Sequence, residues 1–463
     1  MKTPRPRKES LLECTVIELG SADGARAVSP NYPGPIRIIG GVPGDHGLAR
    51  VVHAGQHGVW AQWSTLSDEG PDRREAPCPV VLRCGGCPWQ MVDPAAQRRE
   101  RLLRVRSAIG SYIPDDAGQW TGPDSLDVGY RTRAQVVLGH RRGRIEWGFW
   151  QPSSQIWVPA EHCPAQTRDV DRVLHAACDV LGRHGVMVRH APGEHGASGL
   201  VWRADPRTGQ GLLTILAPDL AAVAHTGPAL LEIPGIIGVF AAIPAHQGGS
   251  ANPATLQHLA GELRAPQTWK PANLPELTLD LGPISFVQTR HDTAEALVAQ
   301  VAEWLPEQGG GLLDLFAGVG FFALALRHRF EHLLLVERQG AASDDAQHNM
   351  DQLGVAHATV RHGDATAVVT ELAGGEQGYE AAIVDPPRSG CGAALVQALT
   401  ALPQLQTIIY ISCALVGLQR DLAAFVEHGW QASDVRLLDM FPHTPQAEVV
   451  VRLVRTLPAT SDQ

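Results

Sequence analysis

The segment GLLDLFAGVG, residues 311–320, joins an apolar run to a glycine-rich turn. The run is typical of a buried strand, and glycines after a strand let the backbone of the turn approach a ligand closely. A strand, a glycine turn and a helix in this order begin a nucleotide-binding unit. One such turn is weak evidence by itself, so the fold has to be inferred from the segments around it.

The apolar runs that follow this segment alternate with helical stretches, which implies a parallel sheet with helices on both faces. The last two runs are joined by a short turn with no room for a crossover helix, so we expect them to pair antiparallel. The predicted fold class is therefore α/β, with a Rossmann-like sheet that has the layout of the S-adenosylmethionine (SAM) methyltransferase fold. The runs after the first cover residues 332–337, 358–362, 381–384, 407–413, 435–441 and 448–454.

Acidic residues stand where three of these strands end. Glu337 ends the second strand, where a carboxylate can hold ribose hydroxyls, and Asp364 ends the third, from which methyltransferases commonly hold adenine. Asp385 ends the fourth strand and begins the sequence Asp385-Pro386-Pro387-Arg388. Tight turns with solvated acids would also explain each residue alone. Because ligands bind beyond the carboxyl ends of parallel strands, the three together favour a binding site.

A thiol and a carboxylate are predicted to meet at the same sheet edge. Cys413 ends the fifth strand, and the final strand begins at Glu448. If the final strand is antiparallel and lies next to the fifth, the two residues are neighbours at roughly 5 Å. A lone cysteine in a strand is often only a packed hydrophobe. A carboxylate beside it favours a nucleophile and a base in one pocket.

Composition limits the classes of protein that fit. The chain has 463 residues and 44% hydrophobic content, which is enough for two or three domains with their own cores. It has no run of about 18 apolar residues and no leader-like N-terminus, so we expect a cytoplasmic protein without a membrane partner. The net charge of -10 argues against binding nucleic acid by bulk attraction, so such contacts must be local.

The domain organisation follows from changes in this pattern. Residues 1–66 alternate short β-like runs with Gly- and Pro-containing turns, which is typical of a small barrel. Residues 67–276 mix strands with an Arg-rich helix at 94–109 and predict one central α+β domain. Residues 277–463 form the third domain. The barrel runs cover residues 13–19, 36–39, 48–53 and 58–63.

Four of the eight cysteines form a candidate metal site: Cys78, Cys84 and Cys87 lie close in the sequence, and Cys163 follows far downstream. In a reducing compartment such clusters more often hold metal than form disulfides. Their spacing alone allows zinc or an iron–sulfur cluster. The C-x3-C-x2-C spacing of radical SAM enzymes is absent.

Basic residues concentrate between residues 95 and 150, where they could neutralise phosphates. Tyr130, Trp147 and Trp150 offer stacking faces for unpaired bases. A solvated helix face is an equally good explanation for the arginines between 98 and 106. The basic residues are Arg98, Arg99, Arg101, Arg104, Arg106, Arg131, Arg133, Arg141, Arg142 and Arg144.

These motifs resemble those of the SAM-dependent RNA uracil-5-methyltransferases over nearly the whole chain. The N-terminal barrel looks like the TRAM domain, an OB-like barrel, of several RNA-modifying enzymes. The most specific matches are Asp314-Leu315-Phe316-x-Gly318-x-Gly320, Asp385-Pro386-Pro387-Arg388, Ser412-Cys413 followed by Leu418-x-Arg420-Asp421-Leu422, and Asp439-x-Phe441-Pro442-x-Thr444-x-x-x-Glu448.

The resemblance implies specific roles. Cys413 would be the nucleophile and Glu448 the base. Ribosomal-RNA members of the family use a similar cysteine spacing for a 4Fe-4S cluster, which Cys78, Cys84, Cys87 and Cys163 would hold here. The SAM and uracil sites would be lined by Gln288, Phe316, Glu337, Asp364 and Asp385.

The chemistry explains why both a thiol and a carboxylate are needed. Uracil C5 is a poor nucleophile until a thiolate adds to C6 and turns C5 into an enolate carbon that can attack the SAM methyl group. A base must then remove the C5 proton before the thiol can leave.

The sequence departs from the family pattern in four places, which could retune its contacts. Ala414-Leu415 stand where Asn-Pro is usual, Phe321 and Arg290 replace Asn, and Gln446 replaces His. We expect a monomeric enzyme that makes 5-methyluridine in RNA, with 23S rRNA favoured because cluster and barrel resemble the ribosomal branch. Methylation of tRNA by the same chemistry, or a non-catalytic RNA-binding or assembly factor with this fold, are the alternatives.

Overall fold

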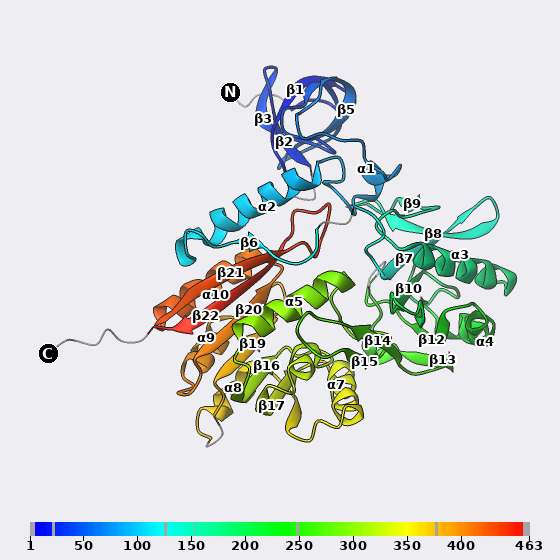
Figure 1. The fold of residues 1–463 in the computed structure, drawn as a ribbon. Coiled ribbons are helices and arrows are strands. Elements are labelled where there is room, and N and C mark those ends of the chain that lie inside the picture. Colours follow the sequence, from blue (N-terminus) through cyan, green and yellow to red (C-terminus); the bar gives the residue numbers. More distant parts are fainter. Residues whose placement is uncertain are drawn as a thin grey trace.

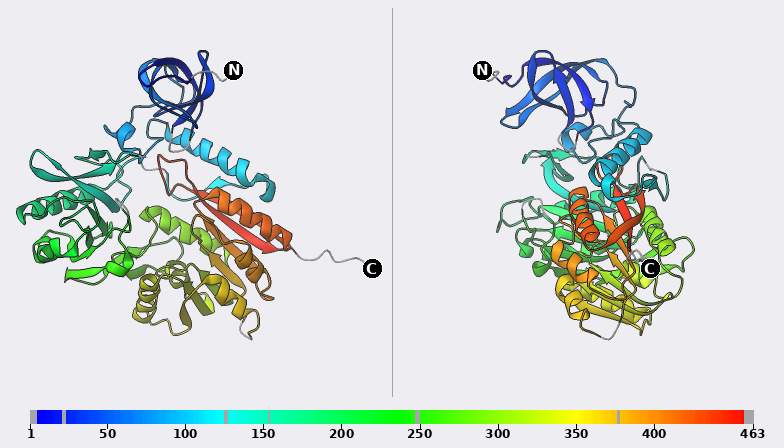
Figure 2. Two further views of the ribbon diagram at one scale, coloured as in Figure 1. Left: turned by 180° about the vertical axis from the view of Figure 1, so that it is seen from behind. Right: turned by 90° about the vertical axis from the view of Figure 1, so that its left-hand side faces the viewer.

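The computed structural model describes residues 5–20, 24–124, 127–152, 154–246, 250–375 and 378–456. They form a small closed barrel, a seven-stranded sheet, an eight-stranded sheet and a two-stranded ribbon (Figure 1). The barrel caps the molecule, and the two large sheets lie beneath it (Figures 1 and 2). Within these residues no helix combines the length and apolar content that crossing a membrane requires.

The N-terminal segment forms the predicted small barrel, but its strands differ from the prediction in two ways. One strand, β2, was not predicted, because its short sequence ARAVS carries little apolar signal. The last strand, β5, continues five residues past the predicted end at residue 63 by pairing with β4 across irregular register shifts. In order around the barrel the strands are β1 (Leu11–Glu18), β2 (Ala25–Ser29), β3 (Tyr32–Ile38), β5 (Gly58–Asp68) and β4 (His46–Gly55).

The central sheet is mixed and is covered on one face by the helix α3 (Arg168–Arg183). Val173, Leu174 and Ala177 of this helix are buried against Trp147 and Leu138 of the sheet. Helix α4 (Gly227–Leu231) packs near β12 and β13. In sheet order the strands are β13 (Gln257–Gly261), β12 (Ile236–Ala242), β11 (Gly211–Leu216), β10 (Gly199–Ala204), β7 (Arg133–Arg141), β8 (Arg144–Trp150) and β9 (Trp157–Pro159).

The C-terminal sheet has the predicted topology. Strands β16 to β20 are parallel, and β22 pairs antiparallel with both β20 and β21. The C-terminal hairpin is therefore confirmed. In sheet order the strands are β18 (Ala358–His362), β17 (Phe330–Glu337), β16 (Gly309–Leu315), β19 (Ala381–Val384), β20 (Thr407–Ser412), β22 (Glu448–Arg455), β21 (Trp430–Leu438) and β6 (Gln119–Trp120).

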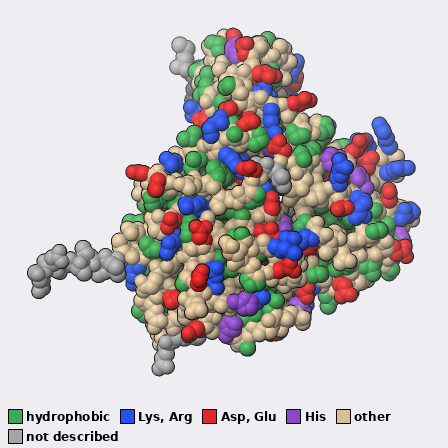
Figure 3. All heavy atoms as spheres, in the orientation of Figure 1, with side chains coloured by type: hydrophobic (Ala, Val, Ile, Leu, Met, Phe, Trp, Pro, Cys, Tyr) green, Lys and Arg blue, Asp and Glu red, His purple; other side chains and the backbone are tan. Residues whose placement is uncertain are grey.

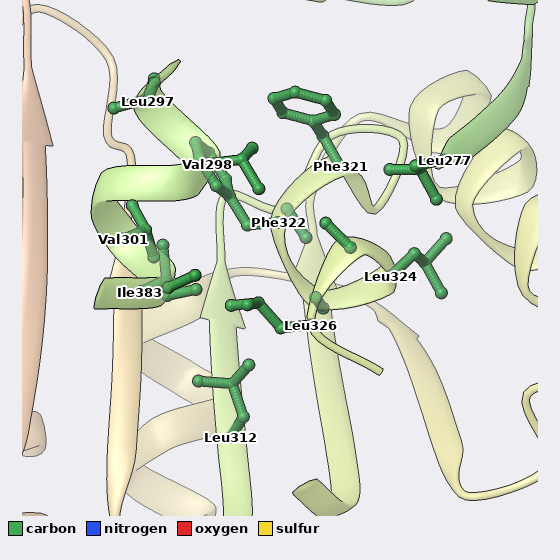
Figure 4. Close-up of a cluster of buried hydrophobic side chains, with 14 of the residues drawn as sticks. Leu277, Leu297, Val298, Val301, Leu312, Phe321, Phe322, Leu324, Leu326 and Ile383 are labelled. Atoms are coloured by element: carbon green, nitrogen blue, oxygen red, sulfur yellow. The ribbon is translucent and has the colours of Figure 1, made fainter. Parts of the chain in front are cut away.

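Helices cover both faces of this sheet because successive strand residues point to opposite sides. Leu312 joins the core cluster on one face, and its neighbour Leu313 joins the cluster on the other. Figure 4 shows part of the first cluster, with Val298 and Phe322 above Leu326 and with Leu312 below it. The helices are α5 (His291–Trp304), α6 (Phe321–Ala325), α7 (Gly340–Gln352), α8 (Ala365–Leu372), α9 (Ala393–Thr400) and α10 (Leu415–Glu427).

The Arg-rich helix α2 (Pro94–Ile109) has the predicted bounds but an unexpected place. It lies between the barrel and the C-terminal sheet in both orientations of the molecule (Figures 1 and 2). Val105 and Ile109 are buried with Leu418 of α10 in the core of that sheet. The two residues of β6 then pair parallel with β21 and extend the sheet by one strand. The boundaries at residues 66 and 276 stay a prediction.

Two arginines of α2, Arg101 and Arg104, are held by contacts within the protein. Arg101 is 1% exposed and its Nη1 donates to the Asp439 carboxylate at 2.5 Å. Arg104 stacks on Trp89 and donates to the Gly20 carbonyl at 3.2 Å. Both explanations of this segment from the sequence, an RNA surface and a solvated face, are therefore wrong for Arg101.

Arg101→Ala should lower the free energy of unfolding by about 3 kcal/mol, because it leaves the buried Asp439 carboxylate without its main partner. Arg98 Nε, at 3.6 Å from Asp439, offsets only part of the loss. Arg99→Ala is the matched control, since it removes an ion pair with Asp72 that is 61% and 41% exposed. That change should cost less than about 1 kcal/mol. Equal shifts of both variants in denaturant unfolding would contradict this account.

Candidate active site

The glycine turn after β16 adopts backbone conformations that favour ligand approach. Gly318 and Gly320 have φ of 56° and 86°, and Phe316 has φ of 61°, which is uncommon for a residue with a side chain. The buried Asp314 carboxylate accepts a hydrogen bond from Ala323 N at 3.0 Å and so fixes the start of α6. Burial raises the pKa of Asp314 to about 7. The turn is thus held in shape by its own strand.

Two of the predicted acids have different surroundings. Glu337 is half-buried beside the glycine turn, where its Oε2 accepts from Gly318 N at 2.9 Å. Asp364 is exposed, and its Oδ1 accepts from Thr366 N and Ala367 N. The structure therefore joins Glu337 to the turn, whereas the visible bonds of Asp364 cap the helix α8.

A hydrogen bond links the segment before α5 to the end of β19. Gln288 Nε2 donates to Asp385 Oδ2 at 3.2 Å. Asp385 N in turn lies 3.4 Å from the Leu315 carbonyl, next to the glycine turn. Burial raises the pKa of Asp385 to about 7. Gln288, Phe316 and Asp385 consequently surround one region at the carboxyl end of the sheet.

The thiol and the carboxylate lie at neighbouring positions of two paired strands. Ser412 of β20 is paired with Val449 of β22, so the next residues in this antiparallel register are Cys413 and Glu448. Glu448 is 3% exposed, and burial together with the charge of Asp385 raises its pKa well above the usual value. Burial and the charge of Glu448 raise the pKa of Cys413.

Arg388 belongs to this site, although the sequence suggested no role for it beyond its motif. It is exposed, and its guanidinium opposes the rise in the pKa of Cys413 through its charge and a hydrogen bond. Its position directly after Pro386 and Pro387 was the available signal. The side chain provides a cation where a thiolate would form.

The four candidate metal ligands line one small cavity of about 30 Å³, beside the short helix α1 (Val81–Cys84). Burial raises the pKa of Cys87 to about 11 and of Cys163 to about 12, and Arg131 opposes both shifts. In the part of the chain that the structure describes, however, no group of three or more His, Cys, Asp or Glu side chains is arranged to hold a metal ion. The structure brings the thiols to one cavity without forming a metal centre.

The predicted stacking platform for RNA bases is largely wrong. Trp147 is fully buried and Tyr130 is 5% exposed, because both belong to the protein interior. Burial also lowers the pKa of Arg133. Arg142 and Arg144 are exposed at the β7–β8 turn. Figure 3 shows Lys and Arg side chains gathered on the side where this hairpin lies.

Comparison with known proteins agrees with this geometry. Residues 282–456, which carry the glycine turn, Asp385, Cys413 and Glu448, match the family model described as tRNA (Uracil-5-)-methyltransferase. An RNA methyltransferase of Gloeobacter violaceus, whose function is uncharacterized, is 28% identical over 90% of this chain and 91% of its own length. The 23S rRNA (uracil(1939)-C(5))-methyltransferase RlmD of Pseudomonas aeruginosa is 29% identical over 89% of this chain and 88% of its own length.

A solved structure shares the fold. The tRNA (uracil-54, C5)-methyltransferase of Pyrococcus abyssi, in complex with S-adenosyl-L-homocysteine, aligns with a TM-score of 0.74 at 20% identity and covers 95% of this chain and 99% of its own. The sheet topology, the residues at its carboxyl edge and the family match lead to one assignment. The segment at residues 282–456 is that of the tRNA (Uracil-5-)-methyltransferase family.

Proposed function

We propose that the protein transfers a methyl group from SAM to C5 of a uridine in RNA through a covalent adduct on Cys413. The observation that carries the proposal is the strand register that places Cys413 beside Glu448, with Arg388 and Asp385 around them. A thiol, a buried carboxyl group and a cation in one place are what this chemistry requires.

The cofactor would bind at the glycine turn. Glu337, already bonded to Gly318 N, lies where ribose hydroxyls bind in such sheets, and Asp364 stands at the next strand end. Asp385, which is bonded to Gln288 and to the carbonyl of Leu315 directly before Phe316, connects this region with the segment before α5. When bound, SAM supplies the electrophilic methyl group. Gly318 has a positive φ and no side chain, so the backbone of the turn is open to the cofactor at that position.

The reaction then uses the residues in order. The Cys413 thiolate, favoured by Arg388, adds to C6 of the uracil, and the pair of electrons from the C5=C6 double bond moves onto C5 and the O4 enolate. C5 attacks the methyl carbon, and S-adenosylhomocysteine leaves. Glu448 takes the C5 proton, the double bond forms again and the thiolate departs. A carboxylate with a raised pKa is a stronger base for that proton.

The RNA substrate we propose is 23S rRNA. The relative named for 23S rRNA is 29% identical over 89% of this chain, whereas the tRNA enzyme of known structure is 20% identical. The exposed arginines Arg142 and Arg144 offer local contacts to phosphates in a chain whose net charge is -10. We also propose that the enzyme acts as a monomer in the cytoplasm.

We further propose that Cys78, Cys84, Cys87 and Cys163 hold a 4Fe-4S cluster. Their thiols line a single cavity, they are half-buried, and Arg131 lies near enough to favour thiolates. Among the described residues no group of three or more of these side chains is arranged to hold a metal ion, so binding would require the cysteine side chains to rearrange. Methyl transfer from SAM needs no electrons, so the cluster would organise this segment.

Glu448→Gln should form the adduct, methylate C5 and then stall, because the adduct cannot collapse while the C5 proton remains. Mixed with radiolabelled SAM and substrate RNA, it should give a protein–RNA species that survives a denaturing gel and carries the label. The Cys413→Ala, Glu448→Gln double variant is the control and should give none. Free methylated RNA released at the wild-type rate by Glu448→Gln would show that another group is the base.

Protein purified without oxygen should be brown, with broad absorbance near about 400 nm from thiolate-to-iron charge transfer. Cys84→Ser should bleach the colour, because it removes one ligand. Cys178→Ser is the matched control, since Cys178 is buried in α3 away from the cavity, and it should leave the spectrum unchanged. Colourless protein with one bound zinc per chain would contradict the cluster.

A further inference from the structure

Arg290 is a fully buried cation that directly precedes α5. We propose that Arg290 is a positioning residue that fixes the segment facing Glu448, so that it is needed for removal of the C5 proton and not for adduct formation. The inference rests on the proposed function of Cys413 and Glu448. It concerns which step of that reaction the fold around Glu448 controls.

Arg290 stands at a junction of the site. It directly precedes α5 and follows Gln288, the residue whose amide donates to Asp385, by two positions. Its backbone forms an isolated antiparallel bridge with Arg131 of the central segment. The side chain is 0% exposed. A guanidinium in such a place is stable only if its donors are satisfied.

All three guanidinium nitrogens of Arg290 donate hydrogen bonds. Nε and Nη2 bind the two oxygens of Asp292 at 2.7 and 2.8 Å. Nη1 donates to the Asp439 carbonyl at 3.0 Å, and Nη2 also donates to the Asp124 carbonyl at 2.9 Å. One side chain thus joins the start of α5, the C-terminal hairpin and the segment after β6.

The Asp439 contact is the one that reaches the catalytic machinery. Asp439 directly follows Leu438, and Leu438 is paired with Glu448 across the hairpin. Arg101 of α2 binds the carboxylate of Asp439, while Arg290 binds its carbonyl. Asp439, which directly follows the strand partner of Glu448, is therefore bound by two buried arginines from different elements.

The far side of the same loop is held in a separate way. His443, with φ of 63°, donates its N–H to Gln97 Oε1 at 2.9 Å and accepts from Trp89 N through its carbonyl at 2.9 Å. These bonds remain when Arg290 is changed. Loss of the Arg290 contact should consequently loosen the end of the hairpin near Glu448 without unfolding the loop.

The two chemical steps respond differently to such a loosening. Adduct formation uses Cys413, which directly follows β20, and none of the four hydrogen bonds that Arg290 donates reaches a residue of that strand. Collapse of the adduct depends on Glu448, and a displacement of about 1 Å in a reacting group can cost about 100-fold in rate. A residue with only a general structural role would slow both steps together.

The experiment measures both steps with Arg290→Lys, using radiolabelled SAM, substrate RNA and denaturing gels sampled over time. The adduct should form at about the wild-type rate and decay at least about tenfold more slowly, so that it accumulates. Arg455→Lys is the matched control. Arg455 also donates to carbonyls, those of Leu402, Leu405 and Thr400, at the opposite end of β22, and its replacement should not cause accumulation.

Asp292→Asn provides a second variant that leaves Arg290 itself unchanged. It weakens the ion pair with the guanidinium by altering Asp292, whose side chain is 38% exposed. It should show the same imbalance between the two steps to a smaller extent. Equal slowing of formation and decay, or absence of accumulation while Glu448→Gln accumulates adduct, would overturn the role of Arg290. Absence of adduct in Glu448→Gln as well would overturn the proposed function, and this inference with it.

Discussion

The antiparallel pairing of β22 with β20 determines where the two proposed reacting groups, Cys413 and Glu448, lie. Ser412 opposite Val449 places Cys413 and Glu448 at adjacent positions beyond the last ladder pair, and a shift of one residue would send one side chain to the other face of the sheet. The register is held by the hairpin with β21 and by the buried ion pair between Arg101 and Asp439. The helix α2, distant in sequence, therefore supports the strand pair that positions Glu448.

Crowding of charge at that edge adapts ordinary residues to the chemistry. Asp385 and Glu448 share a buried region, which raises the pKa of both carboxyl groups. Cys413 lies beside them. Among the strongest influences on the pKa of its thiol, only the Arg388 guanidinium favours the thiolate. Raised pKa values of several ionisable groups in one place are typical of functional sites. Substrate RNA that brings its own charge and excludes water will alter this balance further.

Long apolar runs made the C-terminal sheet predictable, because buried parallel strands have continuous hydrophobic sequences. The hairpin followed from the short turn before Glu448, and with it the neighbouring positions of Glu448 and Cys413. Two-residue β6 has no periodicity, so the sequence could not show that it extends the sheet. The burial of Arg101 and Trp147 was not predicted, because the residue type alone does not show whether an arginine or a tryptophan is buried or faces solvent. The roles of Gln288, Phe316, Glu337 and Asp364 toward a cofactor stay predictions.

The most direct test of the account is the identity of the methylated product. The purified protein is incubated with radiolabelled SAM and, separately, with unmodified 23S rRNA and unmodified tRNA, and the labelled nucleoside is identified after digestion. The account predicts label in 5-methyluridine from 23S rRNA, and none when Cys413→Ala replaces the wild-type protein. Label in 5-methyluridine from tRNA alone would contradict the proposed substrate. SAM binding with no label in either RNA would contradict catalysis.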